Sequence, residues 1–207
     1  MKIHPSIHLP SLGVLRFLPL LFLCGLAHAA TIHFHADLSG SAESPANASP
    51  GMGYADVYID DIAQTMQVKA TFWDLLEGVT AAHIHAATAV PNTGTASVAT
   101  QTPTFLGFPS AVTLGSYDNT FDLTLASTYR AGFITANGGS AATAAVALVN
   151  AFYDEKAYFN IHTTKFPGGE IRGFLSRVPD SGTTALLLTL ALGALAGFSR
   201  VQKLRAG

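Results

Sequence analysis

Apolar and polar residues alternate along most of the chain between residues 30 and 177. Successive side chains of a β-strand point to opposite faces, so this alternation predicts strands that bury one face and expose the other. Two of these segments, 54–59 and 65–72, flank a short polar stretch and predict a hairpin, with Trp73 closing that end of the core. The pattern predicts strands at 32–38, 54–59, 65–72, 80–86, 121–125, 157–162 and 170–175.

The segments between the predicted strands carry turn and loop residues. Residues 39–53 are rich in Ser, Pro, Ala and Gly, and residues 87–116 form a long polar excursion punctuated by Pro and Gly. Ser140 is a suitable N-cap for one short alanine-rich helix that runs towards Phe152. Many short strands, frequent turns and one short helix predict an all-β fold, either a Greek-key sandwich or a barrel.

The N-terminal segment, residues 1–29, has the composition of a secretory signal. It carries two basic residues and an apolar run, and it ends in the A-x-A pattern that signal peptidase recognises, formed by Ala27 and Ala29. We interpret this segment as a signal helix that is removed on export, the alternative being a buried N-terminal helix. The single cysteine, Cys24, lies in it, so the mature chain would form no disulfide.

The C-terminal segment, residues 178–207, combines a short motif, an apolar run over 183–198 and a basic end. The motif consists of Val178, Pro179, Asp180, Ser181 and Gly182. The apolar run predicts a hydrophobic helix shorter than the roughly 20 residues that cross a bilayer core, and the basic end favours a cytoplasmic C-terminus. This arrangement resembles the PEP-CTERM class of bacterial sorting signals in its VPDSG variant. The resemblance implies processing by an exosortase-like enzyme and transient or permanent anchoring at the inner membrane; the alternative is an ordinary single-pass anchor.

The region between these segments, residues 30–177, is long enough for one core and is acidic. It contains twelve Asp and Glu residues against six Lys and Arg residues, which disfavours nucleic-acid binding. Glu170 and Arg172 lie two residues apart on a predicted strand, where an ion pair on one face is expected. No G-x-S-x-G sequence and no phosphate-binding glycine loop occurs, so hydrolase and kinase functions lack support.

Histidines are the candidates for chemistry. His83 and His85 share one face of a predicted strand, and His162 lies on the polar face of another. If the two strands are neighbours, three neutral imidazoles could bind copper or zinc and leave a coordination position open. The alternative is that these side chains only hydrogen-bond to backbone or carboxylate groups. His33 and His35 repeat the same spacing, which an exposed strand face explains.

Two sequence segments together resemble the CHRD domain. The first is Ala82-His83-Ile84-His85-Ala86, and the second comprises 158–163 and the turn and strand 167–173. The resemblance spans about Ile32 to Leu175. The domain is named after chordin, an extracellular antagonist of secreted growth factors, and it also occurs alone in exported bacterial proteins. The resemblance implies an extracellular all-β module.

These observations lead to one hypothesis and one alternative. We expect a non-enzymatic, exported and envelope-associated protein that acts as a structural or interaction module, with extracellular matrix or polysaccharide as its partners. The alternative is a metal-binding or redox protein that uses His83, His85 and His162 on a Greek-key fold. The expected division of the chain is a signal peptide over 1–29, a β domain over 30–177 and a sorting or anchor segment over 178–207.

Overall fold

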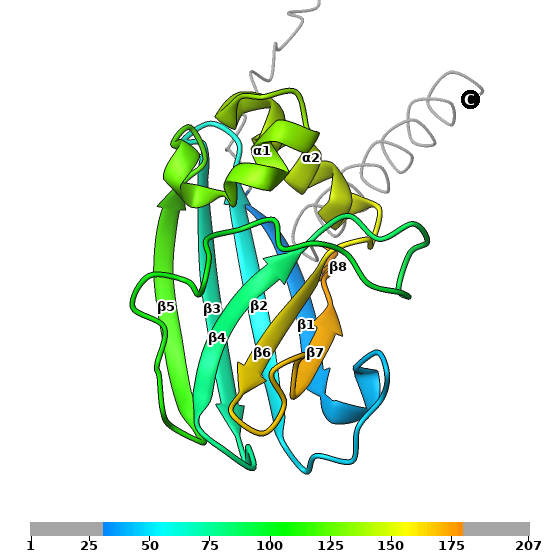
Figure 1. The fold of residues 1–207 in the computed structure, drawn as a ribbon. Coiled ribbons are helices and arrows are strands. Elements are labelled where there is room, and N and C mark those ends of the chain that lie inside the picture. The colour runs from blue at the N-terminus through cyan, green and yellow to red at the C-terminus, as the bar shows by residue number, and fades with distance from the viewer. Residues whose placement is uncertain (1–30, 180–207) are drawn as a thin grey trace, which may run out of the picture.

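A computed structural model describes residues 31–179, which form one antiparallel sheet curled into a half-barrel (Figure 1). The strands follow the order β4-β6-β7-β1-β2-β3-β5, with β8 paired to β1. Their bounds are β1 (Ile32–Ser39), β2 (Met52–Asp60), β3 (Thr65–Trp73), β4 (Val79–His85), β5 (Gly115–Asp122), β6 (Tyr158–Thr163), β7 (Ile171–Phe174) and β8 (Ser176–Arg177). The helices are α1 (Ala131–Ala136) and α2 (Ala141–Tyr153), and 3-10 turns lie at Gly40–Ala42 and Ala126–Thr128.

The alternating pattern produces the inner face of the curl. Strands β1, β2 and β3 pair in unbroken register, so that the buried residues Phe34, Val57 and Val68 lie side by side. Their apolar neighbours two residues away point to the same face. The polar residues of these strands therefore lie on the outer face. The predicted all-β fold and the predicted hairpin are confirmed.

The long loop between β4 and β5 supplies aromatic side chains to the core. Phe105 is fully buried, and its ring centroid lies 5.2 Å from that of Phe121 and 5.9 Å from that of Phe159. These two partners belong to β5 and β6, near opposite ends of the strand order. Phe108 adds a contact to Phe159. The loop therefore fills the space between the two ends of the curled sheet with apolar side chains.

Helix α2 covers one end of the half-barrel (Figure 1). It begins as predicted, because the Ser140 side chain accepts a hydrogen bond from the Thr143 N–H, and the Thr143 hydroxyl accepts one from the Ser140 N–H. Leu148 and Phe152 are fully buried, and Phe152 contacts Phe34 of β1 with a ring separation of 5.2 Å. Among residues 31–179, no helix is long and apolar enough to cross a membrane.

Two predictions about the strands are wrong. The strand expected at 121–125 lies at 115–122, because its alternation starts at Tyr117 with Phe121 as the next aromatic residue facing the core, while Leu125 is 52% exposed before a 3-10 turn. Trp73 does not close the core: it is 37% exposed and contacts Tyr54 edge-on. The predicted signal helix and the predicted C-terminal hydrophobic helix fall on residues outside the described part of the chain.

Candidate metal centre

The pairing of β4 with β6 brings the three predicted histidines together. Ala81 lies opposite His162 and Asn160 lies opposite His83, while the alternate residues Ala82, Ile84, Phe159 and Ile161 are fully buried and face the core. His83, His85 and His162 therefore share the outer face. The ring centroid of His83 lies 4.7 Å from that of His85 and 4.7 Å from that of His162. One ring nitrogen of each histidine lies within 4.8 Å of those of the other two.

Each of these rings uses its Nδ1 atom to contact a backbone carbonyl. The carbonyl of Pro103 lies 3.2 Å from Nδ1 of His83, and that of Ala96 lies 2.8 Å from Nδ1 of His85. The carbonyl of Pro167 lies 2.9 Å from Nδ1 of His162. Ala96 and Pro103 belong to the loop between β4 and β5, and Pro167 belongs to the turn between β6 and β7.

These carbonyls determine where the ring hydrogens lie. A carbonyl oxygen only accepts hydrogen bonds, so each Nδ1 carries the hydrogen, and each neutral ring has a lone pair on Nε2. The Nε2 atoms of His83 and His162 lie 2.9 Å apart. Nε2 of His85 is buried and has no hydrogen-bond partner among the described residues. The site therefore presents three nitrogen lone pairs towards a common centre.

Burial keeps the three imidazoles neutral. Burial, followed by the neighbouring His85 and His162, lowers the pKa of His83 to about 3. Burial also lowers the pKa of His85 to about 4, against the opposing effect of its hydrogen bond to Ala96. The pKa of His162 is lowered for the same reason. Because the neutral imidazole is the form that binds metal ions, the histidines are ready to act as ligands at pH 7.

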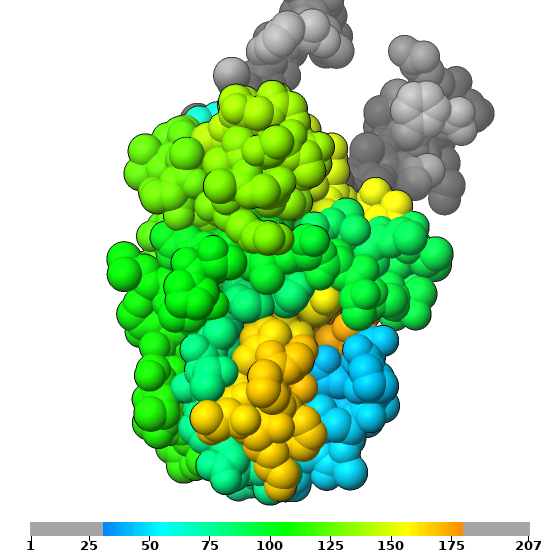
Figure 2. Space-filling model, in the orientation of Figure 1, coloured from blue at the N-terminus to red at the C-terminus, as the bar shows by residue number. Residues whose placement is uncertain are grey.

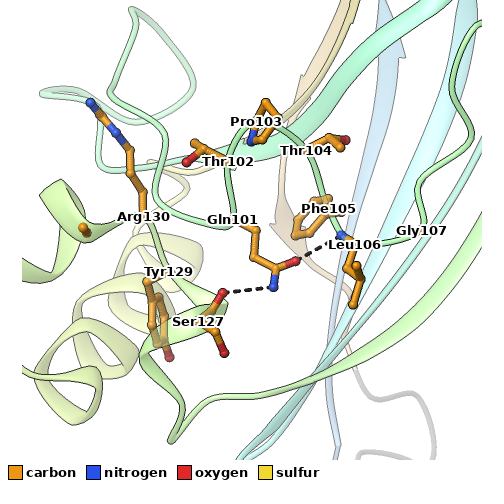
Figure 3. Close-up of a pocket in the computed structure, with 11 residues that line it drawn as sticks. Gln101, Thr102, Pro103, Thr104, Phe105, Leu106, Gly107, Ser127, Tyr129 and Arg130 are labelled. Atoms are coloured by element: carbon orange, nitrogen blue, oxygen red, sulfur yellow. Dashed lines mark hydrogen bonds between the residues drawn. The ribbon is translucent and has the colours of Figure 1, made fainter.

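The loop that presents the Pro103 carbonyl is braced by a side chain (Figure 3). The amide nitrogen of Gln101 donates to the Ser127 carbonyl at 2.9 Å, and its amide oxygen accepts from the Leu106 N–H at 3.0 Å. A shallow hollow of about 430 Å³ lies beside this loop, and none of the three histidines lines it. Gln101 therefore fixes the part of the loop that orients His83.

The turn that presents the Pro167 carbonyl is held by Glu170. This fully buried carboxylate accepts hydrogen bonds from the Thr163 hydroxyl at 2.5 Å, the Ser49 hydroxyl at 2.6 Å and the Leu76 N–H at 2.7 Å. Figure 2 shows the turn (gold) against the segment that follows β1 (blue), and Asn47 donates to the Glu170 carbonyl at 3.0 Å. Charge-assisted hydrogen bonds of this kind are stronger than neutral ones.

The prediction of an ion pair between Glu170 and Arg172 is wrong. Arg172 instead lies with Nε 3.8 Å from Oε2 of Glu43 and donates to the carbonyls of Ala42 and Gly94. Glu170 precedes β7, where the backbone turns, so the two side chains do not share a strand face. The alternation of apolar and polar residues cannot reveal that Glu170 lies outside β7, because Glu170 is adjacent to the strand and fits its pattern.

Arg172 is linked to the histidines through an aromatic stack. Its guanidinium carbon lies 4.7 Å from the ring centroid of Tyr158, and Tyr158 lies parallel to the His85 ring at 4.6 Å.

Burial raises the pKa of Glu43 to about 7 although Arg172 opposes the shift. Gly169, with a φ of 130°, leaves room for the Glu43 carboxyl group, because a Cβ at this position would lie 2.5 Å from Oε1 of Glu43. Sequence analysis missed Glu43, which no motif marks, and it included Tyr158 only as part of the segment that resembles the CHRD domain.

A curled antiparallel sheet that carries a cluster of histidines on its outer face defines an all-β domain. Residues 34–175 match the CHRD domain, so the chain belongs to the CHRD family, which is not a known enzyme family. Residues 177–200 match the VPDSG-CTERM motif, as predicted. This motif marks an exported protein with a sorting signal and implies processing by an exosortase-like enzyme. No curated protein and no solved structure matches the chain.

The predicted sorting and cleavage residues lie mostly beyond the described part of the chain. Val178 and Pro179 are described, and the Val178 N–H donates to the His33 carbonyl at 2.9 Å, so the motif starts where β8 leaves the sheet. Asp180, Ser181 and Gly182 lie outside the described residues, as do Ala27 and Ala29.

Proposed function

We propose that the protein is an exported metal-binding module, in which His83, His85 and His162 hold one copper or zinc ion. The observation that carries this proposal is the convergence of three Nε2 lone pairs. In each ring a backbone carbonyl contacts Nδ1 and so holds the ring hydrogen on that atom. Three carbonyl acceptors that fix the tautomer are the outer-shell arrangement that metal-bound histidines require. The Nε2 atoms of His83 and His162 lie 2.9 Å apart, which is hydrogen-bond distance if one of them carries a hydrogen. With both ring hydrogens on Nδ1, the two lone pairs repel each other, and a cation between them removes that cost.

The pair formed by His83 and His162 needs only a small adjustment to accept an ion. Nitrogen ligands about 2.0–2.1 Å from one metal ion lie roughly 3.3–3.6 Å apart, so the His83 and His162 rings must separate by a few tenths of an ångström. Three imidazoles favour copper and zinc over calcium or magnesium, and the general order of affinities places Cu²⁺ above Zn²⁺. A fourth position remains for water or a partner ligand.

The sorting signal supports a location of this chemistry at the cell envelope. An exported domain meets metal ions before they reach the cytoplasm, and its acidic composition favours their approach. Binding, rather than catalysis, is the activity that the three ligands and the family support. Extracellular matrix or polysaccharide remains the predicted partner of the surrounding surface, and transient or permanent anchoring at the inner membrane remains the prediction for the tail.

The test is a metal titration of the purified full chain after treatment with a chelator. We expect the unaltered protein to bind one equivalent of Cu²⁺ or Zn²⁺ at the three-histidine site. In His162→Gln the affinity of that site should fall at least about 100-fold. Gln67→Ala is the control, because Gln67 lies on the outer face of β3 and bonds only to Asp118 in the described part of the chain. Equal metal binding by His162→Gln and the unaltered, correctly folded protein would remove the proposal.

A further inference from the structure

A second cluster of metal-ligating side chains lies on the outer face of β1 and β2. His33 and His35 occupy alternate positions of β1, and His35 lies directly opposite Asp56 of β2. Nε2 of His33 lies 2.6 Å from Oδ1 of Asp56, and Nδ1 of His35 lies 2.9 Å from the same oxygen. All three side chains are partly exposed, so the cluster is open to solvent on one side.

The rings of this cluster are held in place by aromatic neighbours and by the sheet. His33 stacks on Tyr58 with ring centroids 4.4 Å apart and planes 11° from parallel, and the His35 ring lies 6.3 Å from that of Tyr54. Strand β1 is paired on both sides, with β2 on one edge and with β7 and β8 on the other. Ligands on a strand paired at both edges lose little freedom when an ion binds.

Lysine does not neutralise the carboxylate of this cluster. Lys69 lies opposite Asp56 in the β2–β3 register, yet its Nζ lies 3.5 Å from Oδ2 of Asp118 and 5.7 Å from the Tyr58 ring centroid. The hydrogen bonds of the Asp56 side chain within residues 31–179 come from the two histidines alone. The carboxylate therefore faces two imidazoles.

The far nitrogen of His35 also has an acceptor. Nε2 of His35 lies 3.4 Å from Oδ1 of Asp37. When an ion binds Nδ1 of His35, the ring hydrogen must reside on Nε2, and Asp37 lies where it can accept that hydrogen bond. A carboxylate behind a histidine ligand is the outer-shell partner found at zinc sites.

We propose that His33, His35 and Asp56 form a second metal site that binds Zn²⁺, with Asp37 as the positioning residue for His35. Two imidazole nitrogens and one carboxylate oxygen are a ligand set that zinc accepts, with solvent in the remaining position. On binding, each neutral histidine moves its hydrogen to the nitrogen that does not face the ion, and a protonated histidine releases one proton to solvent. This site shares no residue with the three-histidine site.

A calorimetric titration of Zn²⁺ into the chelator-treated full chain tests this site separately from the first. The unaltered protein should bind two equivalents, and both Asp56→Asn and His162→Gln should bind one. Asp37→Asn should keep the second equivalent with about tenfold weaker affinity. Asp154→Asn, an exposed carboxylate in an ion pair with Lys156, is the matched control and should bind two equivalents.

Each alternative outcome has a distinct meaning. Loss of one equivalent in Asp56→Asn but not in His162→Gln supports the second site and removes the first. An unchanged zinc count in Asp56→Asn, with circular dichroism like that of the unaltered protein, overturns the second site and leaves Asp56 as a hydrogen-bond acceptor only. If Asp56→Asn does not fold, His35→Gln provides the same test, because it removes one ligand and leaves the carboxylate in place.

Discussion

Two histidine pairs with the same spacing have different environments in this molecule. On β4, His83 and His85 donate their ring hydrogens to backbone carbonyls and keep bare nitrogens in a buried site. On β1, His33 and His35 direct ring nitrogens to the carboxylate of Asp56 at a partly exposed site. The difference shows that the H-x-H spacing sets only which face the rings share. The acceptors brought by other segments decide what the rings can bind.

The largest expected difference between the two sites is in folding stability. Glu170→Ala should lower the free energy of unfolding by about 3 kcal/mol or more, because it leaves three donors of the turn beside His162 without their acceptor. Asp56→Ala should cost about 1 kcal/mol, since its partners are partly exposed. Urea denaturation of the metal-free full chain measures both values. Similar losses in the two variants would show that the buried site is no more tightly braced than the exposed one.

The two clusters should respond to pH with opposite sign. The folded-state pKa of His83 is lowered, so the unfolded chain binds more protons and the domain loses stability as pH falls below about 6.5. Burial alone would lower the pKa of His35, but the hydrogen bond to Asp56 and the charge of that carboxylate raise it. The contribution of His35 is therefore fully present below its ordinary pKa of 6.5 and is lost as pH rises through the raised value.

Thermal denaturation in the presence of a chelator between pH 7.5 and 5 tests this sign. His83→Gln should flatten the loss of stability on acidification, and His35→Gln should make it steeper. Glu43 acts in the same direction as His35, because its pKa is raised to about 7, so Glu43→Gln is a useful third variant. Parallel pH profiles for the His83 and His35 variants would contradict the assignment of opposite environments.

The smallest expected effect concerns the loop that orients His83. Gln101→Ala removes the two hydrogen bonds that brace this loop and should cost about 1 kcal/mol of stability. Metal affinity at the three-histidine site should fall about threefold, because the Pro103 carbonyl is held less firmly, while zinc binding at Asp56 stays unchanged. Titration of both sites in one sample compares them directly. An equal change at the two sites would mean that the effect is not local.

Most of the fold could be predicted from side-chain alternation, and the failures have physical causes. The strands around Phe34, Val57 and Val68 follow the pattern because each buries one face, and the strand around Ile161 follows it although both of its faces are buried. Strand β5 was misplaced because polar residues separate its two buried aromatic residues and Leu125 continues the alternation beyond its end. Trp73 was misjudged because size predicts burial only when the strand end is covered.

The candidate site could be predicted only in part. His83 and His85 share a face by local geometry alone, but the position of His162 depends on the pairing of β4 with β6, which are separated by a long loop, strand β5 and two helices. The carbonyls of Ala96, Pro103 and Pro167 belong to irregular segments, and every residue carries a carbonyl, so no sequence signal marks them. Asp56 likewise becomes a neighbour of His35 only through strand register.

The most direct measurement is the hydrogen position on each histidine ring. Long-range ¹H–¹⁵N NMR of the metal-free full chain at pH 7 should show His83, His85 and His162 all as the Nδ1–H tautomer, with the Nε2 signals moving when one equivalent of Zn²⁺ is added. The tautomer of His33 should be Nε2–H, because that nitrogen donates to Asp56. An Nε2–H tautomer on any of the three buried histidines, together with Nε2 signals that zinc leaves unmoved, would contradict the account.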